Sequence, residues 1–551
     1  MAKFRIWLPF IFATLLAAGI YIGMKLNEPF NNKQSFFSFR TGQFNKINDV
    51  VNYISQEYVD TVNQKKLVES TIEGMLHQLD PHSAYIPAED LQAMNEPLEG
   101  NFDGIGVEFH VQQDTIMVVT AVSGGPSEEL GIRSGDRIVK VDGKNVAGIK
   151  ITNTQVTQML RGPSGTKVKV GIYRRGNSDL IDYTITRGKI PVFSVDVGYM
   201  LDDKTGYIKV SHFAERTYEE YLEAFTHLKD LGMESLILDL RGNPGGYLKT
   251  AIQIADEYLP DGKLIVYTQG HARPKETFNS SARGFFEKGK LIVLIDEGSA
   301  SASEIVSGAV QDWDRATVVG RRSFGKGLVQ EQSNFPDGSA IRLTIARYYT
   351  PTGRSIQKPY TAGYDEYENE LFERMKNGEL SSSDSVHFSD SLKYKTPGGK
   401  IVYGGGGIMP DVFVPLDTEG ISGFYKEANG KGLIVQFAYD HLDQHRKEIL
   451  SRYPDFESYR KNFSINSKEY SDFVDYALKN GVKKDEHGVI YSSSLIRIQL
   501  KALIARQIWK NKGFYPIIQE LDLTLKKAVA LMRTNQVADA SSQIAGPGKN
   551  N

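Results

Sequence analysis

The chain has 551 residues, no cysteine, and 65 basic against 67 acidic side chains, which gives a formal net charge of −2 and a pI of about 6.6. This length exceeds what one hydrophobic core supports, so about three or four domains are expected. The near-neutral balance without a basic block argues against a nucleic-acid partner, and the lack of cysteine excludes disulfides and thiolate metal sites.

Residues 1–26 have the pattern of a membrane anchor. Lys3 and Arg5 precede an apolar run from Ile6 to Met24, which is about long enough to span a bilayer. Ala17-Ala18 offers only a weak signal-peptide cleavage site, and the apolar run continues past it. We therefore expect an inner-membrane anchor with the rest of the chain in the periplasm, or export after signal cleavage as the alternative.

Residues 40–98 are expected to form an N-terminal helical segment. Apolar residues recur there at helical spacing, at Ile47, Val50, Val51, Ile54 and Tyr58, and again at Val68, Ile72, Met75 and Leu76. Such helices suit a cap or a dimer arm, so a homo-oligomer is one outcome that the pattern allows.

Residues 99–190 consist of short strands, turns and two helical pieces. Gly104-Ile105-Gly106-Val107 is a glycine loop that enters a strand, and Gly135–Gly143 (GDRIVKVDG) is a turn followed by a strand. This region resembles a PDZ domain. The resemblance implies that the loop binds a terminal carboxylate and that the following strand pairs with an extended peptide. Val156, Met159 and Leu160 on the next helix would then line a pocket for an apolar last residue.

Residues 191–415 alternate buried strands with helices, which predicts a mostly parallel α/β sheet with crossover helices. The expected strands are 235–239, 291–295, 317–319 and 341–345, and the expected helices are 218–231, 250–259 and 303–312. The strand in Leu236–Gly246 ends in a glycine turn before a helix. Such a turn presents free N–H groups that could hold an oxyanion, although a turn that only packs a helix on a sheet has the same pattern.

The strongest chemical signal is a serine followed 25 residues later by a lysine between glycines. Ser301 lies in the small-residue run Gly298–Glu304, and Lys326 lies in Gly325-Lys326-Gly327. A buried lysine that loses its proton can act as the general base for a serine, although a serine in such a run is more often a turn or a helix cap. Gly320–Lys326 also spells a phosphate loop, but Gly327 replaces the required Ser or Thr, which argues against a nucleotide.

Together these segments resemble the carboxy-terminal processing (tail-specific) serine peptidases, in order, from about residue 40 to 415. Four further motifs match: Leu79–Ser83, Gly206–Val210, Tyr349–Gln357 and Gly407–Asp411. The resemblance implies that Ser301 is the nucleophile, Lys326 the base and Gln330 the group that orients the lysine. It further implies an oxyanion hole from the backbone N–H groups of Gly245 or Gly246 and of Ala302, and a supporting role for Asp312.

The implied fold is multidomain α/β: a ClpP/crotonase-like α/β peptidase core with an inserted PDZ domain, an N-terminal helical segment and a C-terminal helical extension. The implied function is a serine endopeptidase that cleaves proteins recognised by their apolar C-terminus through the PDZ domain, with or without an adaptor. A non-catalytic PDZ scaffold is the main alternative. An acyl-CoA enzyme is the second, because crotonase-like folds share the oxyanion turn.

None of the ten histidines lies in a recognisable catalytic triad signature. His441 and His445 are four residues apart in a helical stretch but lack the zinc-protease pattern, so we expect surface residues rather than a metal pair. His82 and His212 are expected to be structural. No metal and no cofactor are therefore expected.

The remaining segments carry weaker signals. The Ser-rich, acidic insert 360–397 is expected to be a surface loop. Residues 416–534 form a helical extension with an apolar stripe at Ile496, Leu500, Leu503, Ile504 and Ile508, which suits packing on the parent domain or a dimer seam. Residues 535–551 are small and polar, and are expected to be a disordered tail.

Overall fold

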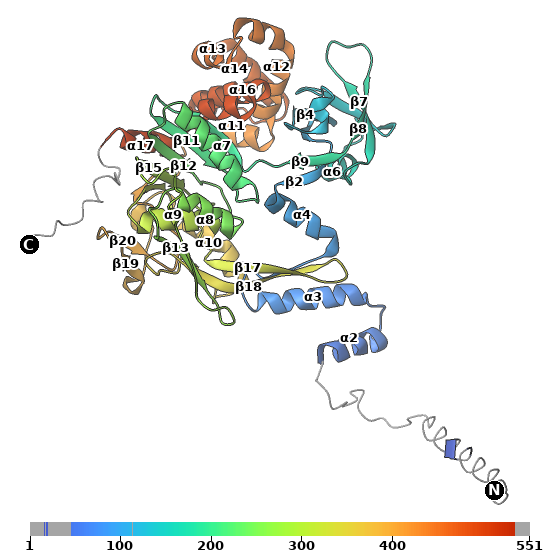
Figure 1. The fold of residues 1–551 in the computed structure, drawn as a ribbon. Helices are drawn as coiled ribbons and strands as arrows, with labels where there is room; N and C mark the ends of the chain where they lie inside the picture. Colours follow the sequence, from blue (N-terminus) through green and yellow to red (C-terminus); the bar gives the residue numbers. More distant parts are fainter. Residues whose placement is uncertain (1–15, 17, 20–45, 113, 535–551) are drawn as a thin grey trace, which may run out of the picture. The chain divides into compact units, whose positions relative to one another are not determined.

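The computed structural model describes residues 16, 18, 19, 46–112 and 114–534 (Figure 1). The expected tail 535–551 and nearly all of the expected anchor 1–26 lie outside the described residues, so both stay predictions. Within the described part of the chain, no helix combines the length and apolar character needed to cross a bilayer. The chain divides into two compact units, the first up to Met75 and the second from Leu76 onward.

The N-terminal segment is helical, as its apolar spacing predicts. It consists of α2 (Lys46–Glu57), α3 (Gln64–His77) and, after the short strand β1 (Ala84–Ile86), α4 (Ala88–Glu99). Gly100, with φ of 71°, ends α4 in a left-handed cap, and its N–H donates to the carbonyl of Glu96.

The PDZ-like region is a separate antiparallel sheet. Its order is β3 (Val107–Gln112), β4 (Thr115–Ala121), β5 (Arg137–Val141), β7 (Lys167–Tyr173) and β8 (Ile181–Thr186), and β6 (Lys144–Asn145) pairs with β5. Helices α5 (Pro126–Glu129) and α6 (Asn153–Leu160) complete it. The chain enters through β2 (Asn101–Gly104) and leaves through β9 (Gly188–Pro191), which pair with each other, so this region is an insertion. Strand β3 forms one edge of the sheet.

The core contains the predicted parallel sheet, in the order β10 (Val195–Met200), β11 (Thr205–Val210), β12 (Ser235–Asp239), β15 (Leu291–Ile295), β16 (Thr317–Gly320) and β21 (Val412–Phe413). Only the β10–β11 pairing in this sheet is antiparallel. Alternate strand residues face opposite sides. One side packs on α7 (Thr217–Asp230), α8 (Leu248–Asp256) and α9 (Ala302–Asp312), and the other on α17 (Leu523–Met532) (Figure 1).

A second, antiparallel sheet holds the strand that we expected at 341–345 in the parallel sheet. That expectation is wrong: β18 (Ala340–Tyr349) pairs with β1, with β13 (Leu264–Gln269) and with β17 (Leu328–Asn334), and β13 also pairs with β14 (Glu276–Asn279). Residues 341–345 are only partly buried, in keeping with a sheet outside the main core.

The insert 360–397 is folded, which corrects the expectation of a plain loop. It contains α10 (Tyr364–Lys376), the short helices η1 (Ser383–Ser385) and η2 (Asp390–Leu392), and β19 (Lys393–Lys395), which pairs with β20 (Ile401–Tyr403). Tyr367 and Arg374 of α10 are buried.

The C-terminal extension is helical and has a hydrophobic core of its own. Its helices are α11 (Gly423–Gly430), α12 (Leu433–Arg452), α13 (Phe456–Asn462), α14 (Ser467–Lys479), α15 (Glu486–Tyr491) and α16 (Ser493–Ile518), followed by η3 (Gln519–Leu521) and α17. The predicted stripe on α16 supplies Ile496, Leu500 and Ile504 to that core as buried residues.

Candidate active site

Two turns meet at the carboxyl ends of β12 and β15, where ligands commonly bind in α/β sheets. The parallel register pairs Asp239 with Leu294, so the glycine turn after β12 and the serine turn after β15 leave the sheet side by side. Gly245 lies so close to the serine turn that an added Cβ would be 2.7 Å from the Cβ of Ser301. The structure therefore brings together the two turns that the sequence singled out.

Ser301 has a strained backbone. It immediately precedes α9 and has φ of 53° and ψ of −110°, in a region that residues with a side chain rarely adopt. Such a conformation costs about 1–3 kcal/mol and persists only where the surroundings impose it. Its N–H donates to Glu304 at 2.8 Å, and its carbonyl accepts from the hydroxyl of Tyr348 at 3.0 Å. A sharp strand-to-helix turn of this kind presents a nucleophilic hydroxyl.

Two of the three expected oxyanion donors are free to bind an oxyanion. The N–H of Gly245 donates to the Asn243 side chain at 2.9 Å, whereas the N–H groups of Gly246 and Ala302 have no acceptor among the described residues. Gly246, with φ of 146°, has no room for a side chain, because an added Cβ would be 2.0 Å from the carbonyl oxygen of Phe213. The geometry therefore favours Gly246 over Gly245 as the partner of Ala302.

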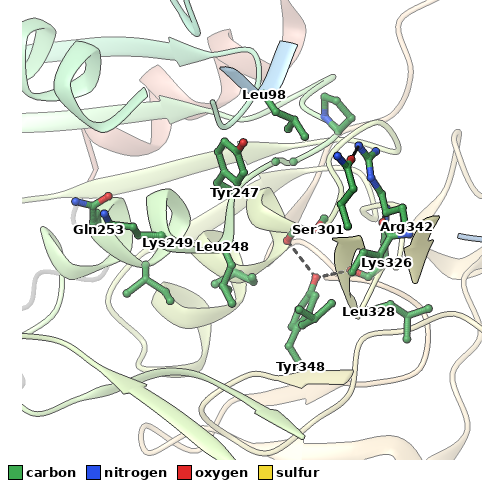
Figure 2. A pocket seen from close by; sticks show the side chains of 18 of the residues that line it. Leu98, Tyr247, Leu248, Lys249, Gln253, Ser301, Lys326, Leu328, Arg342 and Tyr348 are labelled. Carbon is green, nitrogen blue, oxygen red and sulfur yellow. Dashed lines mark hydrogen bonds between the residues drawn. The ribbon is translucent and has the colours of Figure 1, made fainter. Parts of the chain in front are cut away.

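Lys326 shares one cavity of about 820 Å³ with Ser301 (Figure 2). Its Nζ donates to Oε1 of Gln330 at 3.0 Å, and the Gln330 amide nitrogen donates to the carbonyl of His82. Burial lowers the pKa of Lys326, and the nearby charge of Arg342 lowers it further. Within the described part of the chain, no hydrogen bond joins Lys326 to the Ser301 hydroxyl and no carboxylate forms an ion pair with it. The lysine is therefore held by a neutral amide in surroundings that favour its neutral form.

Glu304, on the first turn of α9, ties the serine turn to the lysine segment. Its carboxylate is fully buried and accepts from Ser301 N–H, the Ser323 hydroxyl, Gly325 N–H and Lys326 N–H, at 2.8, 2.5, 2.7 and 2.9 Å. Burial raises the pKa of Glu304 to about 7, and the four donors oppose that rise. We did not predict this role. The spacing Ser301-x-x-Glu304 at a helix start, typical of a capping box, was the available signal.

A loop from the Leu79–Ser83 motif positions Gln330. The Asp80 carboxylate accepts from the N–H groups of His82 and Ser83, both at 2.8 Å, and from the Ser83 hydroxyl at 2.6 Å. The imidazole of His82 contacts the hydroxyl of Tyr367 at 2.7 Å, and burial lowers the pKa of His82 to about 4. His82 is thus structural, as expected, and its carbonyl is the group that reaches the site.

Asp312 does not line the cavity. It is buried at the end of α9, where it accepts from Arg354 at 2.7 Å and from the N–H and hydroxyl of Thr352 at 3.0 and 2.7 Å. The side chains of Asp312 and Arg354 are both 0% exposed. Asp312 therefore stabilises the turn Thr350–Arg354 and does not contact Ser301 or Lys326.

Replacing Asp312 with alanine is expected to lower the free energy of unfolding by about 3–5 kcal/mol, because it leaves the buried Arg354 guanidinium with neutral acceptors only and without its carboxylate. Denaturant unfolding would measure this loss. The exposed Asp261→Ala is the matched control and should change stability by less than about 0.5 kcal/mol. Lost activity at unchanged stability would contradict a purely structural role.

The PDZ-like loop also presents free donors. The N–H groups of Ile105 and Gly106 have no acceptor among the described residues, while the carbonyl of Ile105 accepts from the Ser127 hydroxyl at 2.6 Å. Gly106 has φ of 75°. Val107 begins the edge strand β3, and Gly104 ends β2. The structure differs from the prediction for the residues that would line the peptide pocket. Val156 and Leu160 are buried in the domain's own core, and only Met159 is partly exposed.

The histidines that the sequence raised as possible site residues belong to no cluster of metal ligands in the described part of the chain. Among the described residues, no cluster of three potential metal ligands occurs. His441 stacks on His445 with ring centroids 4.5 Å apart, but it is buried, which corrects the expectation of a surface residue. His212 does not line the cavity.

Comparison with known proteins gives matches along most of the chain. Family models match for peptidase family S41 over residues 204–363, a PDZ domain over 117–174, the N-terminal domain of the activating protease CtpB over 14–90, and a family of unknown function (DUF8443) over 424–510.

Two curated relatives and one solved structure illustrate the similarity. The carboxy-terminal-processing protease of Bartonella bacilliformis is 37% identical over 352 residues, which cover 63% of this chain and 79% of that protein. The carboxy-terminal processing protease CtpA of Bacillus subtilis is 34% identical over 317 residues, 57% of this chain and 67% of that protein. The photosystem II D1 C-terminal processing protease is 26% identical, covers 66% of this chain and 85% of its own, and has a TM-score of 0.35.

Proposed function

The chain belongs to the carboxy-terminal processing proteases of peptidase family S41, and from this premise we propose that it is a serine endopeptidase with Ser301 and Lys326 as a catalytic dyad. One observation carries the proposal. The strained Ser301, the largely buried Lys326 and Gly246 line a single cavity, and Ala302 directly follows Ser301; among the described residues the N–H groups of Gly246 and Ala302 have no acceptor and Lys326 has no carboxylate ion-pair partner. These are the parts that acyl transfer requires.

In the proposed reaction, neutral Lys326 turns from Gln330 and takes the proton of the Ser301 hydroxyl as the oxygen attacks the scissile carbonyl carbon. The N–H groups of Gly246 and Ala302 stabilise the resulting oxyanion. Lys326 then gives its proton to the leaving amine as the C–N bond breaks. Lys326, neutral again, takes a proton from water as the water oxygen attacks the acyl ester, and it gives that proton to the Ser301 oxygen as the ester C–O bond breaks. Between steps the Lys326 amine again donates to Oε1 of Gln330, which restores its starting position.

A serine-reactive fluorophosphonate separates this function from the alternatives. A protein of residues 27–551, which lacks the expected anchor, should cleave an unfolded reporter with an apolar C-terminus. It should lose that activity as the probe accumulates on Ser301, located by peptide mass spectrometry. A folded protein that neither cleaves nor reacts would support the PDZ scaffold. Binding of a CoA thioester in competition with the reporter would support the acyl-CoA enzyme.

We further propose that the PDZ-like loop selects substrates by an apolar, free C-terminus, because Ile105 and Gly106 offer N–H groups beside an edge strand. Ser301→Ala protein should bind a peptide with an apolar C-terminal acid at least about 10-fold more tightly than its amide, since a charge-assisted hydrogen bond is lost. Gly106→Ala should bind both weakly, because an added Cβ would lie 3.0 Å from Ile190 at a φ of 75°. Equal binding of acid and amide would contradict this mode.

Membrane attachment through residues 1–26 is also kept as a proposal, supported by Lys3, Arg5 and the apolar run that follows. Full-length protein should stay with membranes after an alkaline wash. A mature N-terminus beyond Ala18 in the soluble periplasmic fraction would instead show a cleaved signal.

A further inference from the structure

Arg342 lines the same cavity as Ser301 and Lys326, and beyond lowering the pKa of Lys326 it contacts no group in the proposed reaction (Figure 2). It lies on β18 and is only partly exposed. Its Nη2 donates to the side-chain oxygens of Asn95 and Gln332, at 3.3 and 3.0 Å. Both partners are neutral amides, so they hold the guanidinium in place without neutralising it.

Arg342 has no carboxylate partner in the part of the chain that the structure describes. No ion pair includes it, and its Nε and Nη1 donate to no acceptor there. Burial lowers the pKa of Arg342, which reflects the cost of partly desolvating an unpaired charge. The paired N–H donors of a guanidinium match the two oxygens of a carboxylate. Among the groups of a peptide, a carboxylate is therefore the best ligand for Arg342.

The cavity as a whole also favours an anion. Leaving aside Lys326, which acts in its neutral form in the proposed reaction, the cavity's charged lining residues are two cations, Lys249 and Arg342, and one carboxylate, Glu99. Glu99 forms no ion pair with Arg342. A cleft lined mainly by one sign of charge concentrates ligands of the opposite sign.

The strand register places Arg342 on the leaving-group side. Lys326 must protonate the leaving amine, so the departing peptide passes Lys326. Gln330, which holds Lys326, and Gln332 are two residues apart on β17 and hence on one face of the strand. Gln332 pairs with Arg342 across β17 and β18. Lys326, Gln330, Gln332 and Arg342 thus form a row that leads away from the lysine.

The length of this row limits the substrate. Two residues of strand span about 7 Å, and the Lys326–Gln330 contact adds about 3 Å, so about 10 Å is the upper bound for the distance from the lysine amine to the guanidinium, which is close enough for its charge to lower the pKa of Lys326. An extended peptide covers about 3.3–3.6 Å per residue. A carboxylate within about three residues after the scissile bond would therefore reach Arg342.

We propose that Arg342 forms a carboxylate-binding subsite on the leaving-group side, which favours substrates whose free C-terminus lies within about three residues of the cleaved bond. The inference rests on the proposed peptidase function. An aspartate or glutamate side chain at the same position offers the same chemistry from a second source. In both cases the carboxylate accepts hydrogen bonds from the donors that Asn95 and Gln332 leave free.

The test compares kcat/KM for peptides with one to six residues after the scissile bond, each as a C-terminal acid, as an amide, and as an amide with glutamate at the third position. Wild type should prefer acid over amide by about 10- to 100-fold at lengths up to about three, the range of a charge-assisted hydrogen bond, and should lose this preference at longer lengths. Arg342→Gln should bring this ratio close to one, and Arg342→Lys should retain part of it. The exposed Arg347→Gln on the same strand is the matched control and should keep the wild-type ratio.

The ratio isolates this subsite. Removing the charge of Arg342 also raises the pKa of Lys326, but that change affects acid and amide substrates equally and cancels, as does any acid preference of the PDZ-like loop. A high rate for the glutamate amide would identify a side-chain carboxylate as a second ligand. An unchanged ratio in Arg342→Gln, or equal losses for acid and amide, would overturn the inference. Failure of wild type to cleave either the amides or the protein reporter would refute the peptidase function instead.

Discussion

Lys326→Met is expected to lower kcat by about 10⁴-fold or more and to leave the fold intact. Methionine fills a similar volume but cannot take the proton of Ser301, and removing one member of a nucleophile–base unit costs about as much as removing the unit. Ser301→Ala should therefore be equally inactive, and the double variant should be no worse than either single one. Steady-state cleavage of the unfolded reporter measures the loss, and thermal unfolding verifies the fold.

The pH profile of wild type checks the same assignment. Because Lys326 must be neutral to act as a base, activity should rise as pH rises through its pKa, which burial holds below the ordinary value, and should be lost below it. Lys288→Met, at an exposed lysine, should keep wild-type kcat and profile. A Lys326→Met enzyme within about 10-fold of wild type would show that another group is the base.

The core was predictable because its signals are local. The strand around Leu236 and the strand at 291–295 are continuous apolar runs, and the turns after them carry the glycines and the serine. Once two such strands are parallel neighbours, their turns must meet, so the juxtaposition of Gly246, Ser301 and Ala302 follows from pattern and topology.

The rest of the site depends on contacts between residues far apart in sequence. His82 meets Tyr367 across 285 residues, and Gln330 reaches His82 across 248. No periodicity encodes such pairs. The choice between Gly245 and Gly246 depends on a single side chain, because Asn243 takes one of the two N–H groups. Arg241 likewise pairs with Asp522 of the C-terminal extension, 281 residues away.

Glu304→Gln is expected to lower the free energy of unfolding by about 2–6 kcal/mol and activity by about 100-fold. One carboxylate oxygen accepts from Ser323 and Gly325, and the other accepts from the N–H groups of Ser301 and Lys326. An amide nitrogen in place of the second oxygen would face two buried N–H donors, and each buried donor without an acceptor costs about 1–3 kcal/mol. The strained turn of Ser301 and the backbone of Lys326 would then lose their common anchor, and a displacement of about 1 Å can cost 10²-fold in rate.

Stability and rate together identify what Glu304 does. Denaturant unfolding and kcat should fall together in Glu304→Gln, while Glu276→Gln, at an exposed glutamate of β14, should change neither. The pKa of Glu304 is raised to about 7, so its protonated form is favoured in the folded state. Burying the ionised form costs more than the four hydrogen bonds return, so stability falls as pH rises from the ordinary pKa of a glutamate toward about 7; this dependence should vanish in Glu304→Gln. If the variant instead kept full stability and lost only kcat, Glu304 would be a proton carrier in the reaction, because an anchor for two backbone segments cannot be removed without loosening both.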